Sequence, residues 1–431
     1  MKVINSKALS PFGGLNFVLK ELDRVKIGSL LKKELPALSP QSRYNWRDIF
    51  YSYWSVFFCG GNCAEDLSGN FHHSLSVLPF LKIPSPDRVL NRLQELALPA
   101  SYFETKRSKA PHHFAVNDPL SQLNLKITNQ LFNLSKSKVT IDYDNTLCFH
   151  KKKDAEMTYK HSSGYAPGVG LVDSKVIYVE NRNGKNNAST LQDETLERMF
   201  LHLENQNIKV GKFRADSASF TYKALRVIDK YSDVFYVKAR QNQPMLEALA
   251  EIKDWSEFTF NSALFYRGEI MYTPFKRTAK RSGSKKLLRK YRLIVSKTKR
   301  RDGQINVFTN EASYYSVIIT NDLESTPNEV VHFYNQRGTI EREFDVLKND
   351  FGWKNMPFSN LEQNLVYLQI MAMCRNLYHY IIGQFSQRYK GLQPNFRIKK
   401  FIFRFIAIPA KWIFHARQWH LKIYGSIAFK T

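Results

Sequence analysis

The sequence predicts a mixed α/β protein, with a sheet flanked by helices, and three observations support this. From about residue 136, extended and helical patterns follow in the order three strands, helix, strand, helix, strand, which is typical of a mixed sheet covered by helices. The preceding residues are mostly helical, and residues 251–317 contain short extended runs with Gly and Asp-Gly turns. At 431 residues the chain is also too long for one typical domain.

The first segment, residues 1–110, is expected to be a helical region. One of its helices has a clear start, because Ser85 is a cap-like residue and Pro86 occupies the first helical position. Arg88 and Arg92 then fall on one side of this helix, as they would in a DNA-reading helix. An ordinary solvated face is the alternative for these two arginines.

The charge balance points to a polyanionic partner. The chain has 64 Lys and Arg against 38 Asp and Glu, a net charge of +26, while its 43% apolar and 24% charged residues are ordinary for a folded protein. A membrane partner is disfavoured, because the most apolar stretch, 364–385, is interrupted by Arg375, Asn376 and His379 and is expected to be a buried helix. With no signal-peptide run and only four scattered cysteines, the expectation is a soluble, intracellular protein that binds nucleic acid.

Carboxylates mark the strands that follow. "KVTIDYDNTLCFH" alternates apolar and polar residues, which predicts a strand with Asp142 and Asp144 on one face. A later strand, in "IKVGKFRADSASF", ends at Asp216. Asp216 also suits the N-cap of the next segment, a role that is compatible with metal binding.

A long helix carries an unusual polar stripe. The segment 334–348, "YNQRGTIEREFDVLK", places Tyr334, Arg337, Glu341 and Lys348 at about 0°, 300°, 340° and 320° on a helical wheel. Four polar or amphipathic side chains therefore share one narrow stripe beside the apolar face. A surface ion pair between Glu341 and Arg337 is the structural alternative.

The same helix is expected to begin at a capping box, Thr326 with Glu329, and to continue to about Asp350. On it, Glu343 points away from the stripe and is interpreted as a solvated residue, and Asp345 as a solvated residue or one that supports the stripe.

The β-rich segment 251–317 contains a cationic run, 276–292. Expected strands are "FTFNSALFYRGEIMYTPF", "KLLRKYRLIVSK" and "QINVFTN". We expect Lys285, Lys286 and Arg289 to contact the DNA backbone, a role in positioning DNA without reading its sequence, and an ordinary solvated hairpin is the alternative.

Three carboxylates are candidates for one metal site. Phosphodiester hydrolysis needs an activated attacking oxygen and a stabilised leaving oxygen, and two Mg²⁺ ions can supply both. Hard Mg²⁺ selects carboxylate oxygens, so acids from separate elements must converge within a basic surface. The candidates are Asp142 or Asp144, Asp216 and Glu341.

These motifs together resemble the DDE transposases of bacterial insertion sequences, in the branch marked by a Tyr-Arg-Glu-Lys motif. That motif has two residues between Tyr and Arg, three between Arg and Glu, and six between Glu and Lys, which is the spacing found here. "IDYDNT", "GYAPG", "NNAST" and "FRADSASF" add further matches, so the resemblance extends from about residue 140 to 380. It implies a ribonuclease-H-like catalytic core interrupted by a β-rich insertion.

The resemblance also implies roles for individual residues. Asp216 and Glu341 correspond to the second and third acids, and Asp144 is preferred over Asp142 as the first, because a Thr follows it after one residue. Arg337 and Lys348 would contact DNA phosphates near the cut, with Tyr334 beside them.

The implied activity is transposition: binding of the terminal inverted repeats, metal-dependent cleavage at the element ends with two Mg²⁺ ions (Mn²⁺ substituting), and joining of the 3′ ends to target DNA by a homodimeric synapse. A metal-dependent nuclease without strand transfer and an inactive domesticated DNA-binding descendant are the rival functions. The expected regions are a helical DNA-binding region (1–110), the first part of the core (134–250), a basic β-rich insertion (251–317), the second part of the core (318–385) and a basic helical C-terminal region (386–431).

Overall fold

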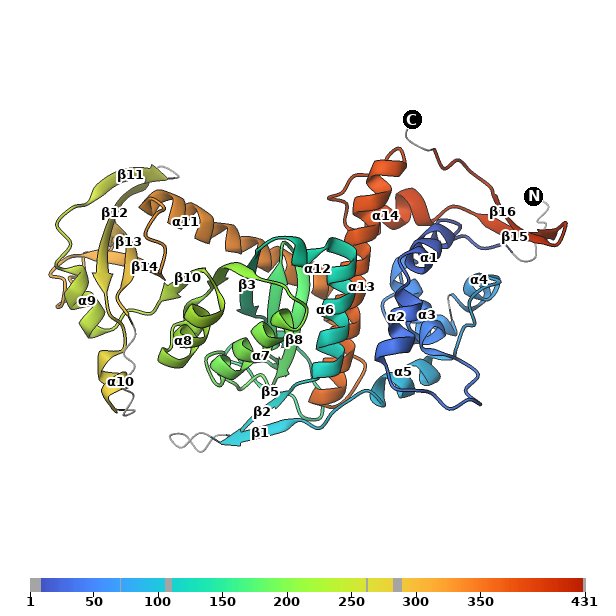
Figure 1. The fold of residues 1–431 in the computed structure, drawn as a ribbon, viewed down its shortest axis with the longest axis horizontal. Helices are drawn as coiled ribbons and strands as arrows, with labels where there is room; N and C mark the ends of the chain where they lie inside the picture. Colours follow the sequence, from blue (N-terminus) through green and yellow to red (C-terminus); the bar gives the residue numbers. More distant parts are fainter. Residues whose placement is uncertain (1–8, 70, 105–110, 261–262, 282–288, 429–431) are drawn as a thin grey trace.

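The computed structural model describes residues 9–69, 71–104, 111–260, 263–281 and 289–428. Three parts lie along its long axis (Figure 1): the β-rich insertion at one end, the central sheet with its helices in the middle, and a helical bundle at the other end.

The central sheet has the ribonuclease-H-like strand arrangement that was expected. Its five strands are β3 (Val139–Asn145), β7 (Gly168–Val172), β8 (Lys175–Arg182), β9 (Val210–Ala215) and β10 (Val234–Ala239). In space they lie in the order β8-β7-β3-β9-β10. The first three form an antiparallel meander, whereas β9 pairs parallel with β3 and β10 pairs parallel with β9. The carboxyl ends of β3 and β9 therefore lie side by side.

The turn between β7 and β8 consists of Asp173 and Ser174. These are the "DS" between the extended runs "GYAPGVGLV" and "KVIYVENR", which the sequence predicts to be a short hairpin-like link. Both residues have positive φ, 44° and 66°, which is the geometry of a two-residue hairpin turn whose twist matches the strands. A small three-stranded sheet lies next to the meander: β4 (Cys148–Phe149), β5 (Glu156–Met157) and β6 (Ser163–Tyr165).

Helices cover both faces of the central sheet. On one face, α6 (Asp118–Phe132) and α13 (Leu361–Arg388) pack against β7 and β8. On the other face, α7 (Gln192–Glu204) and α8 (Tyr222–Tyr231) cover β3 and β9.

The insertion extends this sheet instead of forming a separate one. Its strands are β11 (Ser256–Phe260), β12 (Ala263–Tyr272), β13 (Tyr291–Lys299) and β14 (Ser313–Thr320), with α9 (Gln243–Leu249) and α10 (Lys276–Arg281). Because β14 pairs with both β10 and β13, the sheet is continuous. The prediction of a strand in "QINVFTN" is wrong, since this segment forms only an isolated bridge between Asn306 and Glu311. The residues between these two form a turn, so no further strand pairing is possible.

The N-terminal region is a helical bundle, followed by a strand hairpin. It contains α1 (Leu15–Arg24), α2 (Ile27–Glu34), α3 (Trp46–Phe58), α4 (His72–Ser76), α5 (Pro86–Gln94), β1 (Ser101–Glu104) and β2 (Pro111–Ala115). The Ser85 hydroxyl accepts the Arg88 N–H at 3.4 Å, so α5 starts as the sequence predicted. The chain turns between α1 and α2 at Lys26, whose φ is 57°.

Helix α13 is the central packing element. Its residues join the bundle and the catalytic core in one apolar cluster, and Asn376 is fully buried within it. The Asn376 amide donates to the Val176 carbonyl at 2.7 Å and accepts the Val176 N–H at 2.9 Å, which fixes the helix on β8. The apolar stretch is therefore a buried helix, as predicted. Among helices in the described part of the chain, none is long and apolar enough to span a membrane.

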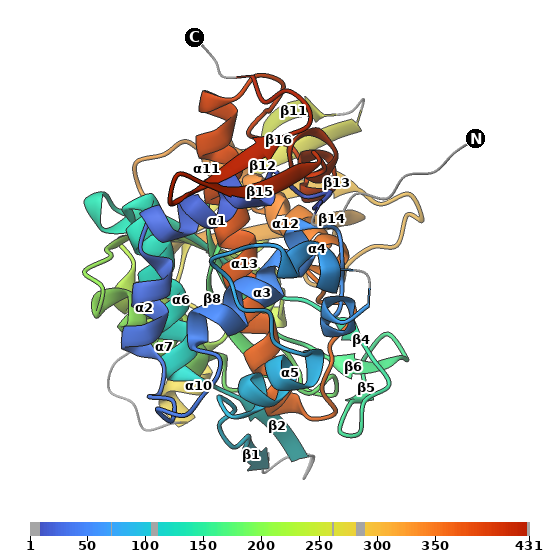
Figure 2. The ribbon, with the colours of Figure 1, turned by 90° about the vertical axis from the view of Figure 1, so that its right-hand side faces the viewer.

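The C-terminal segment differs from the expected helical region. A short helix, α14 (Ile398–Phe401), and a π-helical turn (Ile402–Ile406) are followed by an antiparallel hairpin, β15 (Ala410–His415) and β16 (Gln418–Ile423). The helical expectation is wrong for this last part, because its apolar residues alternate along two strands that pack on α1 (Figure 2).

Candidate active site

Strand register brings two of the three candidate acids together. On the parallel pair β3 and β9, Asp142 lies opposite Arg214 and Tyr143 opposite Ala215. The next positions are Asp144 and Asp216, which therefore lie at neighbouring strand ends, about 4.8 Å apart between strand axes. The Asp216 carboxylate accepts the Ala218 N–H at 2.9 Å, so it caps the turn after β9.

Asp144 is held in an ion pair with Arg337. The Arg337 Nη1 donates to Asp144 Oδ2 at 2.8 Å, and the two side chains are only 16% and 18% exposed. Burial raises the pKa of Asp144; Arg337 opposes this shift, and the neighbouring Asp216 carboxylate adds to it. The carboxylates of Asp144 and Asp216 and the guanidinium of Arg337 are therefore close enough to influence one another's pKa.

Asp142, the alternative first acid, has a different partner. Both of its oxygens accept from Arg214, at 2.6 and 2.8 Å, in a bidentate pair. Arg214 also donates to the Phe333 carbonyl at 2.6 Å and stacks on the Phe333 ring. This pair fastens α11 (Pro327–Asn335) to β3 and β9, and sequence analysis missed Arg214. The available signal was the pair of segments "IDY" and "FRA", whose residues lie opposite one another on β3 and β9.

The predicted long helix is interrupted within the stripe. It begins at the expected capping box of Thr326 and Glu329, but α11 gives way to a 3₁₀ turn (Gln336–Gly338) before α12 (Thr339–Asp350). Arg337 lies in this turn. The stripe residues are therefore distributed over three successive elements and not over one straight helix.

Tyr334 is on the last turn of α11, beside the acids. Its hydroxyl donates to the Ala215 carbonyl at 3.4 Å, next to Asp216, and its ring lies 5.9 Å from the Arg337 guanidinium. Burial raises the pKa of Tyr334, while Arg337 opposes the shift. The phenol therefore stays neutral and able to donate a hydrogen bond.

Lys348 reaches the same end of β3 from α12. Its ammonium donates to the Thr146 hydroxyl at 2.6 Å, two residues beyond Asp144. Thr146, the residue that favoured Asp144 as the first acid in the sequence, is buried, and its contact with Lys348 was not predicted.

Glu341 lies exposed on α12, one turn beyond Arg337. In the described ranges, no three His, Cys, Asp or Glu side chains come close enough together to hold a metal ion. The structure therefore places Asp144 beside Asp216, whereas Glu341 does not lie with them.

Two ion pairs fix α12 in place. Glu343 pairs with Arg375 of α13 at 2.8 Å, and both side chains are largely buried, 12% and 9% exposed. The expectation that Glu343 is solvated is therefore wrong, since α13 packs on that side. Asp350 pairs with Arg397 at 2.7 Å, and the exposed Asp345 contacts the same arginine.

The remaining candidate DNA contacts lie elsewhere. Arg88 is exposed on α5, whereas Arg92 is 17% exposed and pairs with Glu95 at 2.6 Å. Arg289 stays 60% exposed while pairing with Asp229 at 2.5 Å. Lys285 and Lys286 lie outside the described residues.

The donor set of this site suits a divalent cation in its chemistry. Asp144 and Asp216 are adjacent carboxylates whose repulsion a hard cation would relieve, and the Arg337 guanidinium supplies positive charge at this place. Asp144 and Asp216 would hold the cation, and Arg337 would then share the Asp144 carboxylate with it.

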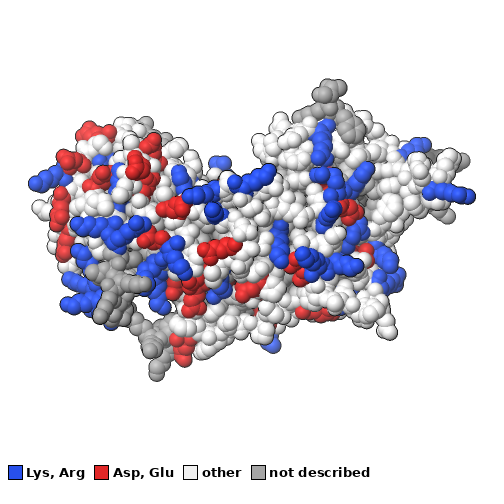
Figure 3. Space-filling view, in the orientation of Figure 1, with Lys and Arg blue, Asp and Glu red and all other residues white. Residues whose placement is uncertain are grey.

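The face of the molecule drawn in Figure 3 carries both basic and acidic side chains. Figure 3 shows a saddle between the insertion and the end of α13, with Lys and Arg side chains on both sides. Figure 1 places α11 along this saddle, leading towards α12.

Comparison with known families decides the class of protein. A family model described as Transposase DDE domain group 1 matches residues 87–431, most of the chain. The chain belongs to the DDE transposases. This agrees with the paired aspartates on a ribonuclease-H-like sheet and identifies the protein, at that level, as a transposase.

Solved transposase structures show limited similarity. The piggyBac transposase in a synaptic complex with hairpin DNA is 12% identical, with a TM-score of 0.45, over 92% of this chain and 81% of that chain. The Mos1 transposase in a paired-end complex with the left transposon end is 13% identical, with a TM-score of 0.18, over 46% of this chain and 59% of that chain. Among curated proteins, none matches this transposase.

Proposed function

We propose that this DDE transposase binds the terminal inverted repeats of its own element, cleaves DNA at the ends and joins the 3′ ends to target DNA. One observation carries the proposal: Asp144 and Asp216 lie at adjacent parallel strand ends, beside Arg337 and Tyr334, in a chain of net charge +26. Neighbouring carboxylates in a chain of high net positive charge suit the hydrolysis of a polyanion such as DNA.

Each residue has a proposed role. Asp144, Asp216 and Glu341 would hold the metal, with Asp144 preferred to Asp142 because Arg214 occupies both oxygens of Asp142. The cofactor is proposed to be Mg²⁺, with two ions per site and Mn²⁺ as a substitute; when bound, it activates the attacking oxygen and stabilises the leaving one. Glu341 must approach the two aspartates, and α12 is the element that carries it.

DNA contacts are proposed around this centre. Arg337 would move from Asp144 to a phosphate near the cut, because its fork geometry suits either anion. Lys348 and Tyr334 would contact the same strand end. Backbone contacts further away are assigned to Arg88, Arg92, Lys285, Lys286 and Arg289, and among these Arg92 must first leave Glu95.

The Tyr-Arg-Glu-Lys spacing supports assignment to the insertion-sequence branch of bacterial transposases, and hence to a protein that acts on DNA in the cytoplasm, at the nucleoid. A homodimeric synapse holding two element ends is part of the same proposal. The proposed regions are those expected from the sequence: 1–110, 134–250, 251–317, 318–385 and 386–431.

The test is an in vitro reaction on DNA that carries the element's own ends. Wild type is compared with Glu341→Gln in Mg²⁺, in Mn²⁺ and in EDTA. Asp345→Asn, which changes an exposed acid on the same helix, is the matched control. We expect end cleavage and joined products from the wild type and the control, and a loss of at least about a thousandfold in Glu341→Gln.

Other outcomes would change the assignment. Cleavage without joined products would identify a nuclease, and DNA binding without cleavage an inactive descendant. Full activity of Glu341→Gln would remove Glu341 from the site.

A further inference from the structure

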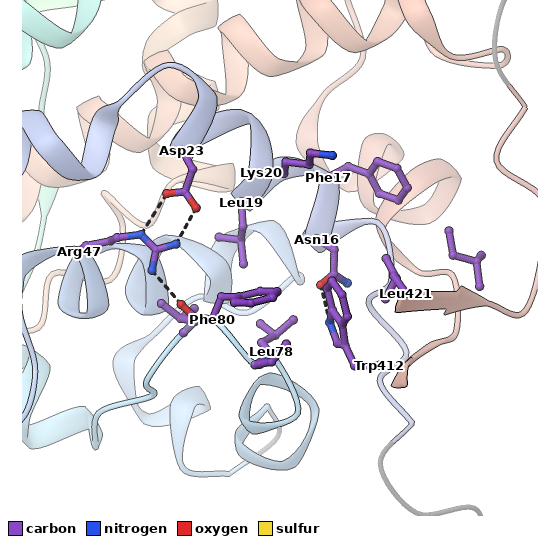
Figure 4. Close-up of a pocket in the computed structure, with 13 residues that line it drawn as sticks. Asn16, Phe17, Leu19, Lys20, Asp23, Arg47, Leu78, Phe80, Trp412 and Leu421 are labelled. Carbon is purple, nitrogen blue, oxygen red and sulfur yellow. Dashed lines mark hydrogen bonds and ion pairs between the residues drawn. The ribbon is translucent and has the colours of Figure 1, made fainter. Parts of the chain in front are cut away.

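The C-terminal hairpin, β15 and β16, is fixed at its base. The backbone of Ala410 exchanges hydrogen bonds of 2.9 and 2.8 Å with Ser10, and the Trp412 indole donates to Asn16 Oδ1 at 2.9 Å (Figure 4). Phe80 packs edge-on against Trp412, with ring centroids 5.4 Å apart. These contacts border an apolar cavity of about 360 Å³.

Beyond this base, the hairpin projects from the end of the molecule (Figure 1). Phe414 and Trp419 face each other across the strands near its tip and are 59% and 45% exposed. An aromatic pair that no neighbouring element covers indicates a surface that meets something else.

The opposite face of the hairpin is cationic. Alternation along the strands places Lys411, Ile413 and His415 of β15 on this face, and Gln418, His420 and Lys422 of β16. Lys411 lies directly opposite Lys422, a pairing of like charges that destabilises a hairpin by itself. The sequence has no Asp or Glu beyond Glu362, so no acid on the hairpin compensates.

The tip is a strained turn. Ala416 and Arg417 have φ values of 49° and 61°, in the left-handed region where Gly or Asn is favoured. A non-glycine residue at such a position costs about 1 kcal/mol or more, and Arg417 adds a cation at the outermost point. An anionic ligand would offset the repulsion between the opposed lysines and would also meet the Arg417 cation at the tip.

We propose that the β15–β16 hairpin is a DNA-binding arm that places its cationic face against duplex DNA. A two-stranded ribbon fits the major groove, which is about 12 Å wide. A second copy of the chain is a poorer partner, because two such faces repel each other. This inference rests on the proposed function, since it takes DNA as the substrate, but no candidate catalytic residue belongs to the hairpin.

The test measures equilibrium binding of the full chain to labelled duplex DNA over a range of salt concentrations. The variants are Lys411→Ala with Lys422→Ala, and Arg417→Gly. The matched control removes two exposed lysines of α8, Lys223→Ala with Lys230→Ala, which are 73% and 62% exposed.

We expect the double hairpin variant to bind roughly tenfold more weakly near 0.1 M salt and its log–log salt slope to fall by about two, against about one for Arg417→Gly. The control should bind as wild type. Melting temperatures should stay the same or rise in both hairpin variants, because repulsion or turn strain is removed; a merely structural role would lower them.

Three outcomes would overturn the proposal. Hairpin variants that bind as the control does would remove the hairpin from DNA binding and leave the proposed function intact. Reduced self-association in sedimentation, with unchanged DNA affinity, would assign the hairpin to a second copy. A wild type that binds no duplex at any salt concentration would overturn the proposed function as well.

Discussion

At the residue scale, the guanidinium of Arg337 is the counter-ion of the Asp144 carboxylate. It opposes the rise in the pKa of Asp144 that burial and the neighbouring Asp216 carboxylate cause. The same guanidinium is the group proposed to contact DNA, so substrate binding and release of Asp144 are coupled events. Under the proposed function, a phosphate that draws the arginine away would leave the carboxylate freer to hold a metal ion.

Asp144→Asn is expected to flatten the pH dependence of stability on the acid side while abolishing cleavage. The pKa of Asp144 is raised on folding, so the native state binds a proton more tightly than the unfolded chain does. Stability contributed by this group is therefore present at low pH and falls as pH rises above the ordinary value of 3.8. Unfolding free energies measured across this window should show the fall in the wild type and not in Asp144→Asn.

Arg337→Gln should act in the opposite direction. Removing the guanidinium leaves Asp144 buried beside Asp216 without a cation, at a cost on the order of 1–3 kcal/mol at neutral pH. Urea denaturation at neutral pH would measure it. A variant as stable as the wild type would show that the ion pair contributes nothing to the native state.

The sequence predicted much of this site. Spacing along one helical stripe identified Tyr334, Arg337 and Lys348, and all three lie near the aspartate strand ends. The sequence did not decide whether Asp142 or Asp144 is the first acid, because both side chains project from one strand face. The difference between them arises from β9, where Arg214 engages Asp142, and such a non-local pairing is set by register.

At the element scale, the 3₁₀ turn between α11 and α12 determines where Arg337 points. Gly338 closes the turn, and glycine is a poor helix former, so the interruption falls within the stripe. The turn lets α11 pack on the β10–β14–β13 face while α12 packs against α13.

Gly338→Ala is expected to raise the free energy of unfolding by about 0.4–1 kcal/mol. Its backbone is right-handed helical, and an added Cβ meets nothing within 4 Å. Gly352→Ala is the contrasting variant: its φ is 73°, and a Cβ would lie 2.0 Å from the Tyr367 hydroxyl oxygen, so stability should drop by more than about 1 kcal/mol. Chemical denaturation measures both, and equal effects would contradict the local geometry.

The C-terminal hairpin was not predicted from the sequence, and the reason is physical. The hairpin turn at Ala416 and Arg417 lacks the Asn-Gly or Asp-Gly signature by which such turns are predicted. The alternating pattern around it is short and rich in aromatics, and so is compatible with a helix. By contrast, the β7–β8 turn contains Asp173, a residue suited to positive φ, and was predicted correctly.

At the scale of the whole molecule, α13 unites the bundle and the catalytic core. Asn376→Ala should lower the free energy of unfolding by about 1–3 kcal/mol, because the buried N–H of Val176 loses its partner, whereas the Val176 carbonyl still accepts from the Asn124 amide at 2.8 Å. Since one apolar cluster spans both parts, fluorescence and circular dichroism should report a single shared transition. Gln384→Ala, on the same helix and half-buried, should change stability little. Separate transitions would show that the two parts unfold independently.

The continuous sheet sets the distance between the candidate active site and the outer edge of the insertion. From β3, which carries Asp144, to β11 at the outer edge there are six strand-to-strand steps, β3-β9-β10-β14-β13-β12-β11. At about 4.8 Å a step this is about 29 Å, or roughly eight base pairs of B-form DNA. Backbone hydrogen bonds and not a flexible tether set each step. If DNA binds as proposed, a duplex held at the far edge would therefore meet the aspartates at a fixed distance along its length.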